Sequence, residues 1–305
     1  MEDDLILQAE DVDADSRLDV FVADNIGEFT RSFLKKHIEN GNISVNGKVQ
    51  KASYKLKPSD IVYVKRIENI IPDILAENIA LDILFEDKDI IVINKPKGMV
   101  IHPAAGHYSG TLVNALMYHC KNELSGINGY LRPGIVHRID MDTSGIIVAA
   151  KSDNAHKNLA EQFAAHSIKR VYEAVAINII KEDNINIDKP IGRHAIDRKK
   201  MCVTDKNSRN AVTHIKVIER FSANTFIEAR LETGRTHQIR VHMAYIGHPL
   251  AGDLVYGPAK DKYKTDGQAL FAKSLGFIHP ATGEYIEFEA KRPEYMEKLL
   301  TKLRG

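Results

Sequence analysis

Residues 134–145 read Gly-Ile-Val-His-Arg-Ile-Asp-Met-Asp-Thr-Ser-Gly, and this polar stretch separates two apolar runs. Ile135-Val136 precedes the charged residues and residues 146–150 follow them, so both runs predict buried strands. Asp140 lies two positions after the cationic Arg138 and shortly before a turn-forming Thr-Ser-Gly. An isolated Arg-x-Asp is most often part of a solvated loop. The rest of the sequence decides whether this carboxylate has a further role.

Four further motifs follow one another along the chain. They are Asn94-Lys95-Pro96-Lys97-Gly98, Lys169-Arg170-Val171-Tyr172-Glu173-Ala174, Thr233-Gly234-Arg235-Thr236-His237-Gln238-Ile239-Arg240-Val241-His242, and Gly247-His248-Pro249-Leu250-Ala251-Gly252-Asp253. Together with residues 134–145, they resemble the motifs of the RluA/RluD-type RNA pseudouridine synthases in content and in order. Ile139 takes the place of the leucine in that family's His-Arg-Leu-Asp signature. The resemblance covers about residues 80–290, and five ordered motifs rarely match by chance.

The resemblance implies a reaction that turns uridine in RNA into pseudouridine. The bond from ribose to nitrogen 1 of uracil breaks, the base rotates, and the bond re-forms through carbon 5. No redox step or external group is needed, so we expect no cofactor. In the family motif, Asp140 is the residue that initiates the reaction. It could add to the anomeric carbon, add to the uracil ring, or assist elimination to a glycal, and the sequence does not choose among these routes.

Other site residues are likewise implied by the family motifs. Arg240 is expected to form an ion pair with Asp140, and Tyr172 to stack on the target uracil and help remove the proton from carbon 5. A uridine inside folded RNA must be extruded to be reached. Arg138 is expected to fill the vacated space or hold the displaced phosphate, and Arg235 to contact phosphate or a loop.

The Asn94-Lys95-Pro96 segment and His102 are expected to line the rim of the pocket. A proline-stiffened turn would account for these residues equally well. The chain also departs from the family at Phe271, where relatives usually have a histidine after Gln-Ala-Leu. We expect that exchange to affect a packing detail or an RNA contact, and not the reaction.

Within the family, the resemblance is closest to the RluD branch. It is carried by Val100-Ile101-His102-Pro103, by Ala105-Gly106, and by residues 231–240. That branch acts on uridines of a helix-loop in large-subunit ribosomal RNA, so the expected partner is this RNA in a ribosomal precursor particle. Sister branches act on other large-subunit sites or on transfer RNA.

Residues 16–66 predict a small compact unit ahead of these motifs. Ser16 can cap a first helix, a second helix ends at Gly41, and Asn46-Gly47 is a strong hairpin signal that follows a short strand. Residues 60–64 predict the last strand. This order resembles the RNA-binding module named for ribosomal small-subunit protein four.

Three basic residues of the second helix are the expected phosphate contacts of this module: Arg31, Lys35 and Lys36. A solvated basic helix would show the same pattern. Contacts to phosphates position a protein on RNA without reading its sequence.

Charge is unevenly distributed over the expected domains. Residues 1–15 contain seven acidic and no basic residues, which leaves +8 on the remainder of a chain whose net charge is +1. We interpret residues 1–15 as an acidic, solvated tail, residues 16–66 as the RNA-binding module, residues 67–80 as a linker, and residues 81–305 as the catalytic domain. A basic body permits RNA binding without proving it.

The expected catalytic domain combines strands and helices. Helices are predicted after Ser152 and near the C-terminus, and strands at residues 90–93, 146–149, 171–176, 212–217 and 226–231. Helices separate the strands too irregularly for βαβ repeats, so we predict an α+β fold whose mixed, mainly antiparallel sheet is flanked by helices. Residues 227, 229 and 231 alternate with the polar residues 228, 230 and 232, which predicts a sheet with one wet face.

Composition predicts a protein of the cytoplasm. Cys120 and Cys202 are too few for a disulfide framework, and none of the 13 histidines falls in a His-Glu-x-x-His pattern, so we expect no metal. No apolar run approaches the roughly 18 residues of a membrane span, and the N-terminus is acidic where a signal peptide would be basic. We take a monomer as the default.

Three alternatives remain. The chain could modify transfer RNA or another RNA site within the same family. It could be a non-catalytic ribosome-assembly factor that keeps the fold, although Asp140, Tyr172 and Arg240 together speak against this. It could also be a glycoside hydrolase that uses Asp140 and Asp142, which would require two opposed carboxylates several ångströms apart.

Overall fold

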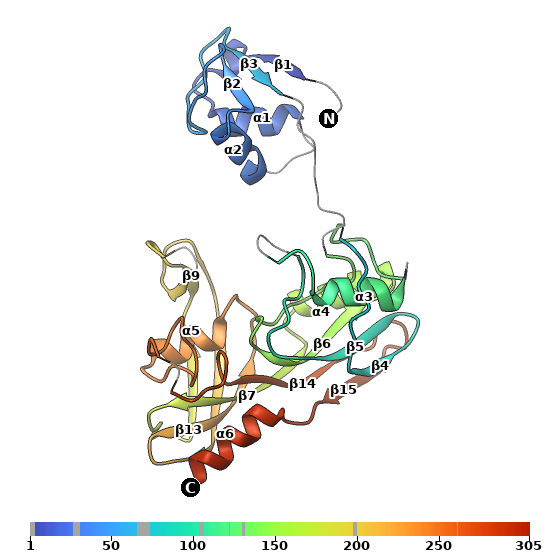
Figure 1. The fold of residues 1–305 in the computed structure, drawn as a ribbon, viewed down its shortest axis with the longest axis vertical. Coiled ribbons are helices and arrows are strands. Elements are labelled where there is room, and N and C mark those ends of the chain that lie inside the picture. The colour runs from blue at the N-terminus through green and yellow to red at the C-terminus, as the bar shows by residue number, and fades with distance from the viewer. Residues whose placement is uncertain are drawn as a thin grey trace. The chain divides into compact units, whose positions relative to one another are not determined.

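The protein folds into two compact units, residues 1–73 and residues 74–305 (Figure 1). The computed structural model describes residues 4–26, 31–65, 74–103, 107–121, 123–129, 132–197, 200–260 and 262–305. The division lies within the expected linker, residues 67–80, of which 67–73 are outside the described residues. Among the described helices, none is long and apolar enough to cross a membrane.

The first unit packs two helices against a three-stranded antiparallel sheet of order β1-β3-β2. Its elements are β1 (Leu5–Gln8), the short 3-10 helix η1 (Asp11–Asp13), α1 (Leu18–Ile26), α2 (Arg31–Glu39), β2 (Ile43–Val45) and β3 (Ile61–Val64). The two predicted helices and the two predicted strands are confirmed. Asn46 and Gly47 both have positive φ, and Val45 bridges Lys48, so the predicted tight turn also forms.

The prediction of a solvated acidic arm over residues 1–15 is wrong for part of that stretch. Strand β1 pairs with β3, with Leu5 opposite Val64. Leu5 and Leu7 pack against the core of the unit, and Ala9 is buried in it. These apolar residues alternate with outward-facing ones, so a strand forms in spite of the acidic residues around it.

A nine-stranded mixed sheet forms the centre of the second unit. Its path is β4 (Ile83–Glu86), β5 (Ile90–Lys95), β6 (Ser144–Ala150), β14 (Leu270–Ile278), β7 (Lys169–Ile177), β13 (Asn224–Leu231), β12 (Val212–Arg220) and β8 (Asn184–Asp188), and β15 (Tyr285–Glu289) pairs with β14. Among the strand pairs described for this sheet, only β14–β6 is parallel. The predicted α+β class with a mainly antiparallel sheet is therefore confirmed. A smaller sheet of order β10-β9-β11 joins β9 (Ile191–Arg193), β10 (Met201–Val203) and β11 (Ser208–Arg209).

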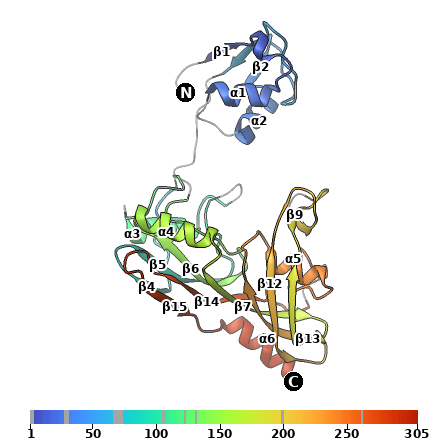
Figure 2. The ribbon, with the colours of Figure 1, turned by 180° about the vertical axis from the view of Figure 1, so that it is seen from behind.

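Apolar side chains cover both faces of the central strands. In β5, Ile91 and Ile93 belong to one core cluster and Ile90 and Val92 to another. Helices α3 (Leu112–Cys120) and α5 (Gln238–Tyr245) contribute to the first cluster, and α4 (Asp153–Ala164) and α6 (Glu294–Arg304) to the second. Figure 2 shows α4 beside β6. The prediction of one solvent-exposed face is thus wrong for the central strands. It holds at residues 227–232, on which it was based, and along β12, where more buried and more exposed positions alternate.

One local prediction beside the site is wrong, and another agrees with the structure. The apolar run at Ile135-Val136 does not form a strand; Ile135 makes only an isolated bridge to Ala149. The exchange at Phe271 is a packing detail, because the phenylalanine is buried in β14 within the second core cluster.

Candidate active site

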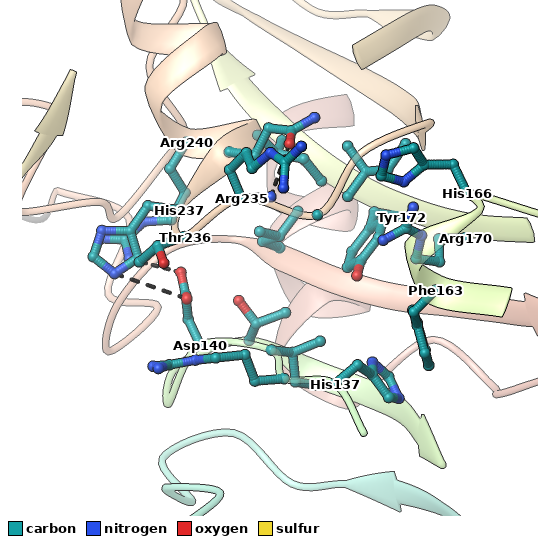
Figure 3. A pocket seen from close by; sticks show the side chains of 18 of the residues that line it. His137, Asp140, Phe163, His166, Arg170, Tyr172, Arg235, Thr236, His237 and Arg240 are labelled. Atoms are coloured by element: carbon teal, nitrogen blue, oxygen red, sulfur yellow. Dashed lines mark hydrogen bonds and ion pairs between the residues drawn. The ribbon is translucent and has the colours of Figure 1, made fainter. Parts of the chain in front are cut away.

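A cavity of about 470 Å³ opens where the segment before β6, the start of β7, the end of β13 and the segment leading into α5 meet (Figure 3). Asp140, Tyr172 and Arg240 all line this cavity. They come from three of the five sequence motifs. The fold therefore brings together the three residues that the family resemblance implies as catalytic.

A buried chain of charges begins at Asp140. Nη1 of Arg240 donates to Oδ2 of Asp140 at 2.8 Å. The same guanidinium donates from Nε and Nη2 to the two carboxylate oxygens of Asp253, at 2.7 and 2.9 Å. The Asp253 side chain is fully buried, whereas that of Asp140 is 16% exposed. Arg240 thus joins one carboxylate at the cavity wall to another behind it.

The two buried partners stabilise each other's charged forms. Burial alone would raise the pKa of Asp253, but the hydrogen bonds and charge of Arg240 outweigh it and lower the pKa. Burial would likewise lower the pKa of Arg240, and Asp253 and Asp140 raise it instead. The backbone N–H groups of Val255 and Tyr256 also donate to Asp253. The guanidinium is therefore held as a fixed cation beside Asp140.

The backbone around Asp140 is held from two sides. Its carbonyl accepts from the N–H of Thr143, and the carbonyl of Met141 accepts from Gly98 N–H and from Nζ of Lys95. Gly145 has φ of +115°, and a Cβ there would lie 2.2 Å from the carbonyl oxygen of Ala272. A glycine is therefore required for β14 to pack against the start of β6.

Gln238 holds the segment that leads into α5. Its side-chain oxygen accepts from the Thr233 hydroxyl and from Arg235 N–H, and its amide donates to Val212 O and Thr213 Oγ1. The helix begins at Gln238, because His237 adopts the left-handed conformation. This turn aims the side chains on both sides of it at the cavity.

His237 is a site residue that sequence reasoning missed. Its Nε2 lies 3.8 Å from Oδ1 of Asp140, and its Nδ1 lies 2.8 Å from the Tyr256 hydroxyl. That hydroxyl already accepts from Met201 N–H, so its own proton is free to donate to Nδ1. A neutral ring that accepts from this hydroxyl carries its proton on Nε2, which faces Asp140. Burial lowers the pKa of His237, which favours this neutral form.

Tyr172 and Arg170 lie on the same face of β7, because side chains two apart in a strand share a face. Tyr172 is 9% exposed, and burial raises the pKa of its phenol. Arg170 is 7% exposed and lines the same cavity. The sequence did not single out Arg170 as a site residue, although it lies two positions before Tyr172 in the motif at residues 169–174.

A third wall of the cavity is built around His137. Its ring stacks on Phe163 with the ring centroids 4.6 Å apart, and its Nε2 accepts from Val148 N–H at 3.0 Å. Strand β14 pairs with β6 only at Ser144 and Gly145. His137 therefore takes the place of a neighbouring strand further along β6. Burial and then the charge of Arg170 lower the pKa of His137 to about 3, so the ring is neutral.

The residues expected at the rim of the pocket lie elsewhere. None of them lines the cavity: Asn94, Lys95, Pro96 and His102. Lys95 is fully buried, and its Nζ donates to the carbonyls of Pro96, Met99 and Met141. It anchors the backbone behind Asp140. Asn94 donates to Asp82.

The expected RNA-binding arginines and lysines fall in two places. Arg138 and Arg235 line the cavity. The other three lie on α2 of the first unit, where Lys35 and Lys36 are exposed. There Arg31 donates to Asp19 at 3.1 Å, and Lys35 lies 3.7 Å from Glu39. Within the described part of the chain, no group of three or more His, Cys, Asp or Glu residues is arranged to hold a metal ion.

Comparison with known proteins agrees with these features. The family model for RNA pseudouridylate synthases matches residues 89–245, and that for the S4 domain matches residues 16–62. The uncharacterized RNA pseudouridine synthase YlyB of Bacillus subtilis is 53% identical over 288 residues, 94% of each chain. Ribosomal large subunit pseudouridine synthase D of Zymomonas mobilis is 45% identical over 301 residues, which cover 94% of this chain and 93% of the relative.

A solved structure shares the fold. Human RNA Pseudouridylate Synthase Domain Containing 1 superposes with a TM-score of 0.57 at 24% identity, covering 74% of this chain and 95% of that one. The chain belongs to the RNA pseudouridylate synthase family. It is an isomerase of uridine in RNA, with an S4 domain in its first unit.

Proposed function

We propose that this enzyme converts uridine to pseudouridine in large-subunit ribosomal RNA, and that Asp140 begins the reaction. The observation that carries the proposal is the Asp140 carboxylate, which lies in the cavity wall 2.8 Å from a buried arginine. The guanidinium of Arg240 donates to this carboxylate and holds it in place, as a positioned nucleophile or base requires. The side chain remains partly exposed, so a nucleotide in the cavity can reach it.

The proposed reaction needs only groups of the chain and of the RNA. The bond between carbon 1′ and nitrogen 1 breaks, and its electron pair leaves with the uracil. The base rotates, carbon 5 bonds to carbon 1′ and loses its proton, and nitrogen 1 gains a proton, so the product is an isomer of uridine. Asp140 assists the first step as nucleophile or as base. Tyr172 supports the base by stacking, and its raised pKa speaks against a free phenolate as the group that takes the proton.

Binding of folded RNA is the second part of the proposal. Arg138 and Arg235 at the cavity meet the phosphates around an extruded uridine, and Arg138 fills the space that the uridine leaves. Arg31, Lys35 and Lys36 of the S4 domain add contacts to phosphate. The choice of large-subunit RNA rests on the Zymomonas mobilis relative, whose name specifies the large subunit.

The test is release of tritium from large-subunit ribosomal RNA labelled at carbon 5 of uracil, with Asp140→Asn as the matched variant. We expect release by the unaltered protein only. Asparagine keeps the shape of the side chain but cannot act as a nucleophile or base. Release by both proteins would contradict the role of Asp140. Release from labelled transfer RNA alone would show that the substrate is a different RNA.

Two other functions are less well supported. A non-catalytic assembly factor would bind the RNA without tritium release and would have no need of a charged carboxylate in the cavity. A glycoside hydrolase would need a second carboxylate in the same cavity. Asp142 does not line it and lies instead against Gly267.

A further inference from the structure

Arg170 is a buried cation that has no counter-ion in the part of the chain that the structure describes. Its side chain lines the cavity at 7% exposure, and no carboxylate of the described residues lies within ion-pair distance of it. Nη2 donates to the carbonyl of Glu232 at 2.6 Å, but Nε is buried and has no hydrogen-bond partner among the described residues. Burying a charged donor without a partner is costly. A group that the protein binds is therefore expected to complete the site.

The surroundings fit a ligand and not a loosely packed side chain. Cζ of Arg170 lies 5.8 Å from the centre of the Phe163 ring. On the other side, Gly234 leaves room for the guanidinium, since a Cβ there would lie 2.6 Å from Nη1. The side chain is thus held in one place, at the wall of the cavity that also holds Asp140.

The position of Arg170 relative to Tyr172 indicates which part of a nucleotide it meets. In the view of Figure 3, the Tyr172 ring lies between Asp140 and Arg170. A uracil stacked on that ring, with its sugar at Asp140, turns its opposite edge toward Arg170. Carbon 4 and its oxygen are opposite nitrogen 1 in the ring. When the bond to carbon 1′ breaks, the electron pair left on nitrogen 1 is delocalised onto the carbonyl oxygens.

We propose that Arg170 donates hydrogen bonds to the carbonyl oxygen of the target uracil that lies opposite the sugar, and so stabilises the uracil anion between bond breaking and rejoining. This inference rests on the proposed function of the cavity. A half-turn of the base about its N3–C6 axis exchanges nitrogen 1 with carbon 5 and O4 with O2. The same arginine therefore meets O4 in uridine and O2 in pseudouridine. It stays protonated throughout, so no proton passes through it.

The first test is Arg170→Met, measured by single-turnover pseudouridine formation in a large-subunit RNA fragment at saturating enzyme. We expect the rate to fall about 10²-fold, as for loss of one donor to a developing oxyanion. RNA affinity and its salt dependence should stay unchanged, because no phosphate contact is lost. The melting temperature should be unchanged or higher, because an unpaired buried charge is removed. Arg170→Lys keeps the charge but not the planar pair of donors. Its single-turnover rate should lie between those of the unaltered enzyme and Arg170→Met.

Arg235→Met is the matched control, because Arg235 lines the same cavity and is expected at phosphate. It should weaken RNA binding and reduce the slope of log affinity against log salt by about one. The same result for Arg170→Met, with an unchanged rate at saturation, would show that Arg170 binds phosphate and would overturn the proposal. The proposal would also be overturned if Arg170→Met had a lowered melting temperature that accounts for its lost rate, because this would show a structural role.

A modified substrate identifies the atom. The same RNA with 4-thiouridine at the target offers a weaker acceptor at that position. The sulfur should slow the unaltered enzyme more than it slows Arg170→Met, because the variant has no bond to lose. Equal slowing of both would contradict a contact to O4. Failure of the unaltered enzyme to modify any RNA would instead refute the proposed function, and not this assignment.

Discussion

Substitution of Asp253 by asparagine tests whether the buried carboxylate holds the active arginine in place. Asp253 accepts from Nε and Nη2 of Arg240 through its two oxygens, and one of these oxygens also accepts two backbone N–H groups. Asparagine keeps the volume, but its amide must place an NH₂ group against one of these donors. Asp253→Asn therefore loses at least one charge-assisted hydrogen bond and leaves Arg240 with Asp140 as its only carboxylate.

The magnitude follows from the burial of the pair. Removal of one partner from a buried ion pair costs about 3–5 kcal/mol. Because Arg240 still has Asp140 at 2.8 Å, we expect the lower end, about 3 kcal/mol. For a domain of this size that lowers the melting temperature by about 6–12 °C. A displaced guanidinium also leaves Asp140 misplaced, so the rate of pseudouridine formation should fall about 10²-fold.

Thermal melting and the single-turnover rate are measured side by side with Asp183→Asn as control. Asp183 accepts from Arg220 at 2.6 Å but is 79% exposed. An exposed pair contributes less than about 1 kcal/mol, so this variant should melt like the unaltered protein. If Asp253→Asn melts with the control, the reasoning from burial is wrong. If it melts early but retains its rate, Asp253 stabilises the fold without positioning Arg240.

Three further predictions concern the walls of the cavity. His137 should show no NMR titration between pH 5 and 8, because its pKa is lowered to about 3. An unfolded histidine titrates near 6.5, so the contribution of His137 to stability should be lost as the pH falls from about 6.5 toward 3. A ring that titrates near 6.5 would contradict this. Lys95→Met removes the Lys95 donor from the carbonyls of Pro96, Met99 and Met141, of which only Met141 still accepts from Gly98 N–H. Differential scanning calorimetry should therefore show a loss of about 1–3 kcal/mol in the free energy of unfolding. An unchanged melting temperature would mean that Lys95 does not hold this backbone. Tyr172→Phe should lower the rate of pseudouridine formation less than tenfold. Tyr172→Ala should lower it about 10- to 100-fold further, since stacking on a base contributes about 1–3 kcal/mol. Equal losses in the two variants would show that the hydroxyl, and not the ring, is needed.

Local sequence pattern accounts for most of the fold. Runs of apolar residues predicted β5, β6, β7, β12 and β13, and helical spacing predicted α4 and α6. Strand β1 was not predicted, because the acidic residues around Leu5 and Leu7 suggest a solvated segment. The strand forms because it pairs with β3, which the local sequence does not show. The coverage of both sheet faces was missed for a similar reason. Which helix packs on which face is set by tertiary contacts.

The site was predictable only in part. Spacing alone could not join Asp140 to Arg240, which lie 100 residues apart, and the family motifs supplied that pair. Asp253 stood in a quoted motif, but nothing local shows that its side chain is buried against Arg240. The family motif placed Lys95 at the rim of the pocket, and nothing local in the sequence shows that its side chain is buried. Its full burial depends on three carbonyls that the chain brings together from two segments.

The shared arginine explains how a carboxylate can change its charge in the middle of this site. If Asp140 forms a bond to the nucleotide or takes up a proton, it loses its negative charge. An arginine paired with Asp140 alone would then become an unpaired buried cation, which is strongly unfavourable. Arg240 also donates two hydrogen bonds to Asp253, which do not depend on the charge of Asp140. Asp253 therefore leaves Arg240 with a counter-ion while Asp140 is neutral. Arg240 is then already in place when Asp140 regains its charge.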